Sequence, residues 1–145
     1  AAAPMLRPPG GPAACRHPMT RFLLVCLGGA AGSGARYLVS DWAASALGAT
    51  FPAGTLIVNV VGSFLISMVM YLGLTAGAIS PELRIFLATG VMGGFTSYSS
   101  FNYELLGYLE RGAWGLGFTY LGATALGCFG SGVLGLWAAR WLWGG

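Results

Sequence analysis

The sequence predicts an all-α integral membrane protein with four transmembrane helices, the third of them broken near its middle. Only 8% of the residues are charged and 56% are hydrophobic, a composition that does not suit the surface of a soluble domain. The apolar residues form four runs, each of about 20 residues or more, which is the length that crosses a bilayer. One run contains adjacent Gly93 and Gly94 followed by several hydroxyl residues, and both features weaken a helix.

Residues 1–18 precede the membrane channel domain, which is expected at 19–145. They are rich in Ala, Pro, Gly and Arg, a composition that does not build a packed element, so a disordered extension is expected. Met19 stands directly before the first apolar run and resembles a natural start. A cleaved signal peptide is the alternative, but three further spans follow the first run, so cleavage is not needed to explain it.

The first span is expected over 22–40. Gly28 and Gly32 lie on one face of this helix and allow another backbone to come close. Arg36 stands at the predicted outer end of the span. It is either an anchor that extends to the interface or a charge that attracts anions at a vestibule.

The second span is expected over 52–73, with Pro52 in the first turn, where proline is well tolerated. Asn59 lies at mid-membrane depth in this span, and a buried carboxamide must find hydrogen-bond partners. It either joins two helices or donates to a passing anion.

The third span is expected over 82–109, with the break at 93–98. Backbone groups freed inside a membrane are tolerated only where protein or a water-filled cavity satisfies them, so a broken helix often marks an ion or substrate site. Phe101 and Glu104 lie three residues apart on nearly one face after the break. Because a buried carboxylate is costly unless paired or hydrated, Glu104 is expected to act in function or at a dimer interface.

The fourth span is expected over 114–143. Trp137, Trp141, Trp143 and Arg140 form an interfacial belt at its end. Two stripes at four-residue spacing run along this helix: small residues that allow close packing, and a second stripe that either lines a path or fills the core. The small stripe is Gly127, Ser131 and Gly135, and the second is Tyr120, Thr124 and Cys128.

The charged residues and cysteines exclude several other classes of protein. The net charge of +3 rests on seven arginines, three of them in the first 21 residues, and does not describe a nucleic-acid-binding surface. Cys15, Cys26 and Cys128 show no metal-binding spacing, and we interpret the last two as small buried hydrophobes.

Three motifs resemble one known family over residues 22–143. They are GGAAGSGARYLVS in the first span, FPAGTLIVNVVGSFL in the second and LATGVMGGFTSYSSFNYE in the third. In this order they resemble the motifs of the CrcB/Fluc family of fluoride channels. Two positions of the third motif differ from the usual family pattern, because Tyr98 stands in place of phenylalanine and Asn102 in place of serine.

The resemblance implies an antiparallel, dual-topology homodimer in the inner membrane of a prokaryote. Two pores in this dimer would carry fluoride passively down its gradient and protect the cell from fluoride, which is transport and not enzyme catalysis. The resemblance assigns Asn59, Tyr98 and Phe101 to the pore and Arg36 to its entrance. Backbone carbonyls of Gly93 and Thr96 would hold a structural sodium ion at the dimer centre.

Further pore candidates are polar side chains on the two helices that follow the break. A strongly hydrated anion needs donors in place of water, and hydroxyl and amide groups and the positive edges of aromatic rings supply them. The hydroxyl candidates are Ser99, Ser100 and Thr124. Glu104 is a further candidate, as the carboxylate that lies well inside the third span.

Arginine placement favours dual topology, provided that residues 1–18 are left out. Three arginines then lie on one side of the membrane and two on the other, which is almost no positive-inside bias. With the extension included the ratio becomes five to two. The three are Arg21, Arg84 and Arg140, and the two are Arg36 and Arg111.

Two other classes of function share these features. Small multidrug exporters also have four spans and weak charge bias, but they rely on a carboxylate in the first span, and this first span has none. A non-transporting assembly subunit would need only the glycine faces, and the broken polar segment argues against it. Ion flux into liposomes separates the three.

Overall fold

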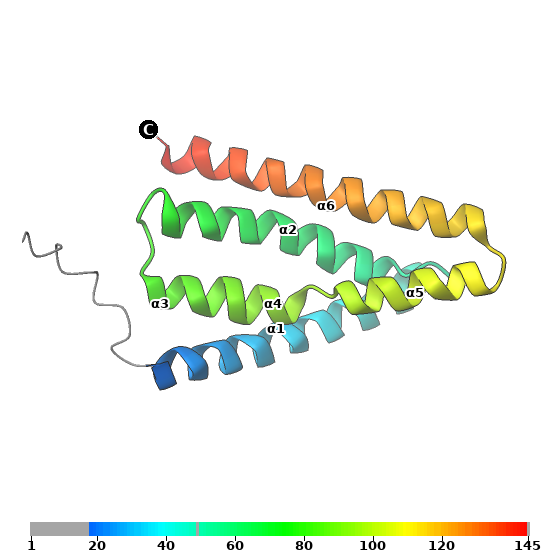
Figure 1. Cartoon of the computed structure of the whole chain (residues 1–145), viewed down its shortest axis with the longest axis horizontal. Coiled ribbons are helices and arrows are strands. Elements are labelled where there is room, and N and C mark those ends of the chain that lie inside the picture. The colour runs from blue at the N-terminus through cyan, green and yellow to red at the C-terminus, as the bar shows by residue number, and fades with distance from the viewer. Residues whose placement is uncertain (1–17, 49, 145) are drawn as a thin grey trace, which may run out of the picture.

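The structure, a computed structural model, describes residues 18–48 and 50–144, and over these it consists of four helical segments packed side by side (Figure 1). The predicted disordered extension lies outside the described residues, except that Pro18 already belongs to the first helix. The third segment is divided into four pieces. In chain order the elements are α1 (Pro18–Leu47), α2 (Ala53–Leu74), α3 (Pro81–Arg84), η1 (Ile85–Met92), α4 (Gly93–Phe95), α5 (Tyr98–Glu110) and α6 (Trp114–Trp143).

Within the described part, three unbroken helices are long and apolar enough to cross a membrane, namely α1, α2 and α6. The remaining segment, from α3 to α5, is third in chain order and is interrupted, so it does not contain one long unbroken helix. The chain is therefore an all-α, multi-pass membrane protein with a broken third span. The ends of the second and third spans differ from the expected ranges by one residue each.

The first helix is longer than the range 22–40 that the sequence indicates. It starts four residues earlier and ends seven residues later, so Asp41, expected in a linker, is helical. It stops at Gly48, whose φ of +86° is a left-handed conformation that glycine tolerates best. Its 30 residues make about 45 Å of helix, against a hydrocarbon core of about 30 Å. Arg36 consequently lies inside the helix and not at its outer end.

The break in the third span is narrower than the predicted 93–98. Only Thr96 (φ −82°, ψ 155°) and Ser97 (φ −147°, ψ 99°) are extended, whereas Gly93 and Gly94 remain helical in α4. The eight residues of η1, directly before Gly93, form a π-helix. This wider helical turn is often found at functional sites. The sequence did not indicate it.

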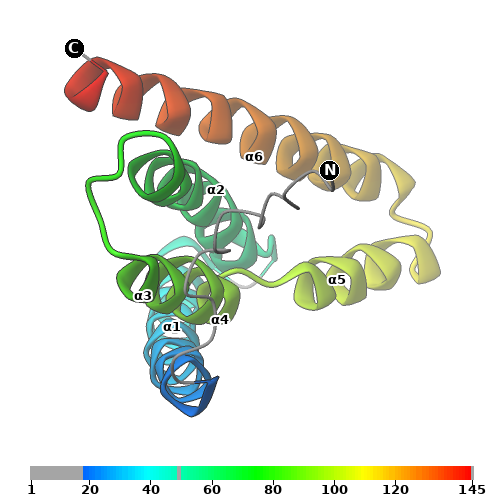
Figure 2. The ribbon, with the colours of Figure 1, turned by 60° about the vertical axis from the view of Figure 1, so that its left-hand side comes forward.

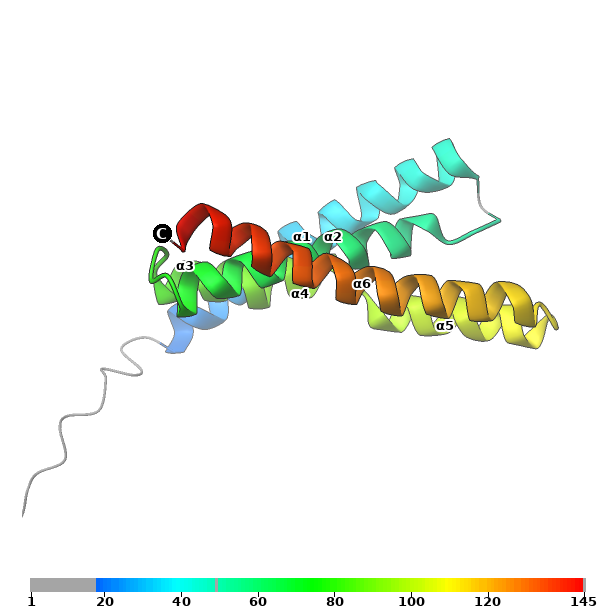
Figure 3. The same ribbon diagram turned by 90° about the horizontal axis from the view of Figure 1, so that it is seen from above.

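The break lets one span change its packing partner halfway along. The first half, η1 and α4, packs against α1, and the second half, α5, packs against α6. Figure 2 shows α5 displaced from α4 toward α6. Seen from above in Figure 3, the α1–α2 and α5–α6 hairpins separate toward their turns. The two halves of the third span therefore have different neighbours.

Close backbone contacts join α1 to η1 and α6 to α2. On α1, Gly28 touches η1 so closely that an added Cβ would lie 2.6 Å from the Phe86 carbonyl oxygen, and Gly32 meets the same element. On α6, Gly135 packs against the backbone of Phe64, and the Ser131 hydroxyl donates to the Val60 carbonyl oxygen at 2.7 Å. Both small-residue faces predicted from the sequence are confirmed as packing faces.

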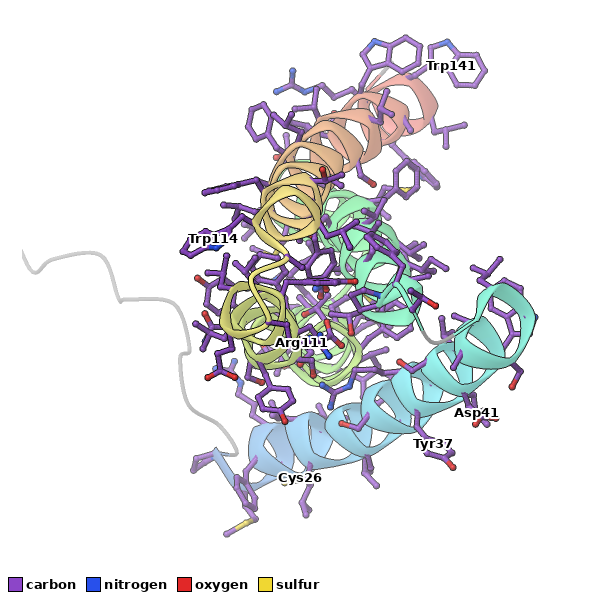
Figure 4. All side chains as sticks on the ribbon, turned by 90° about the vertical axis from the view of Figure 1, so that its right-hand side faces the viewer. Cys26, Tyr37, Asp41, Arg111, Trp114 and Trp141 are labelled. Atoms are coloured by element: carbon purple, nitrogen blue, oxygen red, sulfur yellow. The ribbon has the colours of Figure 1, made fainter. Side chains whose placement is uncertain are left out.

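The outside of the bundle is apolar. Leu126 and Phe129 on α6 are both 75% exposed, and Figure 4 shows Trp114 and Trp141 pointing outward near the two ends of that helix. In water such a surface would be unstable, but in a bilayer it faces acyl chains and the aromatic rings suit the two interfaces. Many large apolar side chains therefore lie on the outside of the bundle and not in an internal core.

Candidate functional site

A cavity of about 450 Å³ lies beside the break, between α2, α5 and α6. We call it the mid-bundle cavity. Its wall combines apolar side chains with an amide, hydroxyls, two aromatic rings and a thiol, and contains no acidic residue. The lining residues are Asn59, Gly62, Ser63, Ile66, Thr96, Tyr98, Phe101, Leu121, Thr124, Ala125 and Cys128.

Asn59 connects α2 to the broken segment. Its Oδ1 accepts a hydrogen bond from the Ser97 backbone N–H at 2.8 Å, and its Nδ2 donates to the Ser97 carbonyl oxygen at 3.3 Å. One carboxamide thus contacts both backbone groups of Ser97, whose carbonyl oxygen also accepts from the Phe101 backbone N–H at 3.4 Å, where α5 begins. Asn59 is 8% exposed and also borders the mid-bundle cavity. An Nδ2 group carries two N–H donors, so one donor remains after the bond to Ser97.

Ser97 also starts the second half of the span. It is the N-cap of α5, and its hydroxyl oxygen accepts from the Ser100 backbone N–H at 3.2 Å. The same hydroxyl lies 2.7 Å from Ser100 Oγ and 3.4 Å from Ser99 Oγ. Ser97 is not among the site residues predicted from the sequence. The signal was present, because a serine directly before a helix start is a common N-cap.

Thr124 contributes an unsatisfied hydroxyl. Its Oγ1 is buried and has no hydrogen-bond partner among the described residues, although the residue borders the mid-bundle cavity. Buried polar groups nearly always have a partner. A water molecule or an ion in the cavity is therefore the natural partner for this hydroxyl. Cys128, one turn further along α6, borders the same cavity.

The two aromatic residues of the cavity differ in burial. Phe101 is 6% exposed and Tyr98 is 78% exposed, with their ring centroids 5.8 Å apart. Behind Phe101 lies Tyr120, at 5.2 Å, and Phe51 meets Tyr120 edge-on at 5.5 Å. Packing on its inner side holds Phe101, whereas the Tyr98 ring is free on most of its surface within one chain.

Glu104 lies outside the mid-bundle cavity and is bound by two hydroxyl groups. Its Oε1 accepts from Thr55 Oγ1 at 2.7 Å and its Oε2 from the Tyr120 hydroxyl at 2.6 Å. Thr55 is 8% exposed and Tyr120 is fully buried. The carboxylate thereby joins α5 to both α2 and α6. Thr55 was missed by sequence reasoning, because nothing in the sequence pairs it with a residue 49 positions away.

Three predicted site residues do not line the mid-bundle cavity. Ser99 is exposed, and Ser100 shares with Glu104 a second cavity of about 400 Å³ near the start of α2. Arg36 is partly buried on α1 and does not line the mid-bundle cavity.

The two residues expected at a sodium site lie on α4 and at its end. Gly93 is exposed, and an added Cβ would meet nothing within 4 Å. Thr96 is the extended residue at the end of α4, and its hydroxyl donates to the Met92 carbonyl oxygen at 2.9 Å.

Comparison with known families gives a match that covers most of the chain. The model of the CrcB-like protein, Camphor Resistance (CrcB), matches residues 23–136, which includes α2, the broken segment and most of α1 and α6. The chain belongs to the CrcB family. The family resemblance expected from the three motifs is thereby confirmed.

Individual CrcB relatives align with most of this chain at high sequence identity. A protein of Anaeromyxobacter dehalogenans is 56% identical over 126 residues, which are 87% of this chain and all of that protein. One from Sorangium cellulosum is 48% identical, over 84% of this chain and 96% of its own length. One from Thermus thermophilus is 50% identical, over 80% of this chain and 85% of its own length. Each carries the name "Fluoride-specific ion channel FluC".

Proposed function

We propose that this CrcB-family chain is a fluoride-specific channel that lets fluoride leave the cell passively, down its gradient, and so protects the cell. Family membership and the names of its relatives support this activity. The structural observation that carries it is the mid-bundle cavity, whose wall offers an amide, hydroxyls and ring edges and has no carboxylate. Such a wall suits a small hydrated anion, because donors replace water and no fixed negative charge repels it.

Within this proposal, the polar groups of the cavity bind the ion as it passes and take the place of its water molecules. The free N–H of Asn59 and the unsatisfied hydroxyl of Thr124 are donors, and the rings of Tyr98 and Phe101 present positive edges. Arg36 attracts anions from the vestibule. Ser99 and Ser100 supply hydroxyls beyond the cavity. Glu104 borders that part of the route, where both of its carboxylate oxygens accept hydrogen bonds from the Thr55 and Tyr120 hydroxyls.

The proposal includes an antiparallel homodimer with two pores and a central sodium ion. Sodium is a hard cation that takes several oxygen ligands. No cluster of acidic, histidine or cysteine side chains among the described residues could hold a metal ion. The backbone carbonyls of Gly93 and Thr96 are the two oxygens that this proposal assigns to each chain. A second copy across a two-fold axis would supply two more carbonyl oxygens, so binding of the ion would require the dimer.

Flux from reconstituted liposomes tests the proposal. Purified protein should release fluoride from loaded vesicles without a proton gradient, and chloride release under identical conditions should stay near that of empty vesicles. Proton-coupled uptake of an organic cation, without fluoride release, would instead identify an exporter. Absence of fluoride release from folded, reconstituted protein would overturn the proposal.

A further inference from the structure

A cavity of about 320 Å³ lies at the end of the molecule where α5 turns into α6. We call it the turn cavity. Figure 4 looks onto this end, with Arg111 in the turn and Trp114 at the start of α6. Both helices belong to membrane spans, so their connecting turn lies at a membrane surface, and the exposed Trp114 suits that interface. The wall of the turn cavity contains one guanidinium, two carboxylates and two phenol rings.

Arg111 is positioned at the turn cavity by packing and not by an ion pair. Its guanidinium carbon lies 5.6 Å from the centre of the Tyr108 ring, and the Tyr108 hydroxyl donates to the Thr50 carbonyl oxygen at 3.0 Å. A Cβ at Gly107 would lie 3.5 Å from Arg111 Nη2, so glycine leaves room for the guanidinium. In the described part of the chain, no carboxylate forms an ion pair with Arg111. Its N–H donors are therefore available to a ligand.

Two carboxylates border the same cavity, and the protein satisfies one of them. Both oxygens of Glu104 accept hydrogen bonds from hydroxyl groups. Glu110 is exposed in the last turn of α5, and no arginine pairs with it within the residues that the structure describes. The neighbouring residues Glu110 and Arg111 thus offer one negative and one positive group. Since two carboxylates outnumber one guanidinium, a ligand of net negative charge is disfavoured.

Apolar surface adjoins these charged groups. Tyr103 is 80% exposed and Leu106 is 48% exposed, and both border the turn cavity. They lie three residues apart, on one face of α5. A hydrocarbon chain can lie along this face while the charged groups remain at the membrane surface.

We propose that the turn cavity binds a zwitterionic phospholipid whose headgroup carries a primary ammonium. Arg111 donates to two phosphate oxygens, the geometry in which a guanidinium binds phosphate best. Glu110 accepts a hydrogen bond from the ammonium, and Tyr103 and Leu106 contact the first part of an acyl chain. A choline headgroup has no N–H to donate to Glu110, and an anionic headgroup without an amine is repelled by it. This lipid site goes beyond the proposed ion path and does not depend on fluoride transport.

Native mass spectrometry of the full chain tests the site. The protein is incubated in detergent with equal amounts of phosphatidylethanolamine, phosphatidylcholine and phosphatidylglycerol that carry identical acyl chains and differ in mass. The retained adducts should favour phosphatidylethanolamine over each of the others on the order of threefold, the size expected for one ion pair at an exposed site.

Variants of the two charged residues identify where the lipid binds. Arg111→Gln should remove the preference, and Arg111→Lys should keep part of it. Glu110→Gln should lower the retention of phosphatidylethanolamine to that of phosphatidylcholine. Because Arg111→Gln also removes the contact with Tyr108, Glu110→Gln tests the site without that change. Arg84→Gln is the matched control, since Arg84 lies at the opposite end of the molecule and packs against Gly73 (Figure 1).

Equal retention of the three lipids by the parent would overturn the proposal, as would a preference that survives Glu110→Gln or that Arg84→Gln removes as well. Glycerophosphoethanolamine, which has the same headgroup without acyl chains, should not displace the bound lipid at equal concentration. Displacement by it would mean that the acyl chain contributes nothing and would overturn the assignment of a lipid. Fluoride release is not part of this measurement, so a failure of the proposed function would leave its result unchanged.

Discussion

Asn59 shows how one side chain can serve both structure and transport. Its two hydrogen bonds to Ser97 hold the backbone of the break in place, and its remaining N–H is available beside the mid-bundle cavity. The two interpretations that the sequence left open, a link between helices and a donor to an anion, are therefore compatible. The link is observed, and the donor role stays a prediction.

Asn59→Asp should abolish fluoride release and also weaken the fold. The aspartate loses the Nδ2 donor and places an oxygen against the Ser97 carbonyl oxygen, which costs about 1–3 kcal/mol for a buried unsatisfied group. Thermal unfolding in detergent and liposome flux measure the two effects. Thr119→Ala, which removes only an exposed hydroxyl bonded to the Gly115 carbonyl oxygen within α6, is the control and should leave flux and stability nearly unchanged. Wild-type flux in folded Asn59→Asp would refute the donor role.

Tyr98 tests whether a ring edge is needed. Its ring is mostly exposed in one chain and lies 5.8 Å from Phe101. Tyr98→Phe keeps the ring and its positive edge, so flux should be at least equal to that of the parent, whereas Tyr98→Ile should be much slower. Both variants are compared as dimers of equal reconstituted amount. An isoleucine variant as fast as the parent would mean that Tyr98 only packs.

Tyr120→Phe should destabilise the protein by removing a donor to Glu104. The lost bond is short and fully buried on the tyrosine side, so a cost of about 1–3 kcal/mol is expected. Tyr108→Phe is a close control, because its hydroxyl donates to the Thr50 carbonyl oxygen near the end of the bundle. The difference between the two melting temperatures measures the effect. Equal melting temperatures would show that Glu104 does not depend on Tyr120.

At the scale of the elements, the break matters because it lets the two halves of one span pack against two different helices, α1 and α6. Before it, η1 and α4 pack tightly on α1, and after it α5 packs on α6. The adjacent glycines at the start of α4 have different surroundings. Gly94 packs on the backbone of Gly29 in α1, while Gly93 faces open space.

Gly94→Ala should therefore damage the fold, whereas Gly93→Ala should not. A Cβ at Gly94 would overlap the Gly29 carbonyl oxygen, and overpacking of this kind costs about 1–3 kcal/mol. The melting temperatures of the two variants in detergent measure the difference between these adjacent positions. If Gly93→Ala folds normally but fails to dimerise or conduct, the cause lies outside the single chain. Equal stability of the two variants would refute the close α1 contact.

At the scale of the whole molecule, a single chain leaves several proposed site groups incomplete. Tyr98 and Gly93 are both exposed, and two carbonyls do not complete a sodium site. Much apolar surface also remains on the outside, where lipid or a second copy can cover it. These observations are consistent with a proposed dimer in which each copy completes the other.

Native mass spectrometry from detergent should show a dimer, and replacing sodium by a large organic cation should increase the monomer fraction. Gly93→Ile should have a similar effect even in sodium, because a branched side chain would occupy space next to the carbonyls. Thr96→Ser, which keeps the backbone and a hydroxyl, is the control. A dimer that is indifferent to sodium and to Gly93→Ile would contradict the central ion.

The sequence alone determined the class of the protein, its four spans and its broken third span. Hydropathy and helix-breaking residues are local signals, because each follows from the chemistry of neighbouring residues. The motifs were sufficient to identify the family. Local signals also located the small-residue faces on α1 and α6, since residues four apart share a helix face.

Only the tertiary structure decided which polar groups meet. The bonds from Asn59 to Ser97 and from Thr55 to Glu104 join residues 38 and 49 positions apart, and no periodicity predicts such a pair. The extent of α1 and the π-helical turn of η1 were also missed. Helix packing overrides weak local preferences at such places, so the position of a break depends on which neighbour can satisfy its backbone.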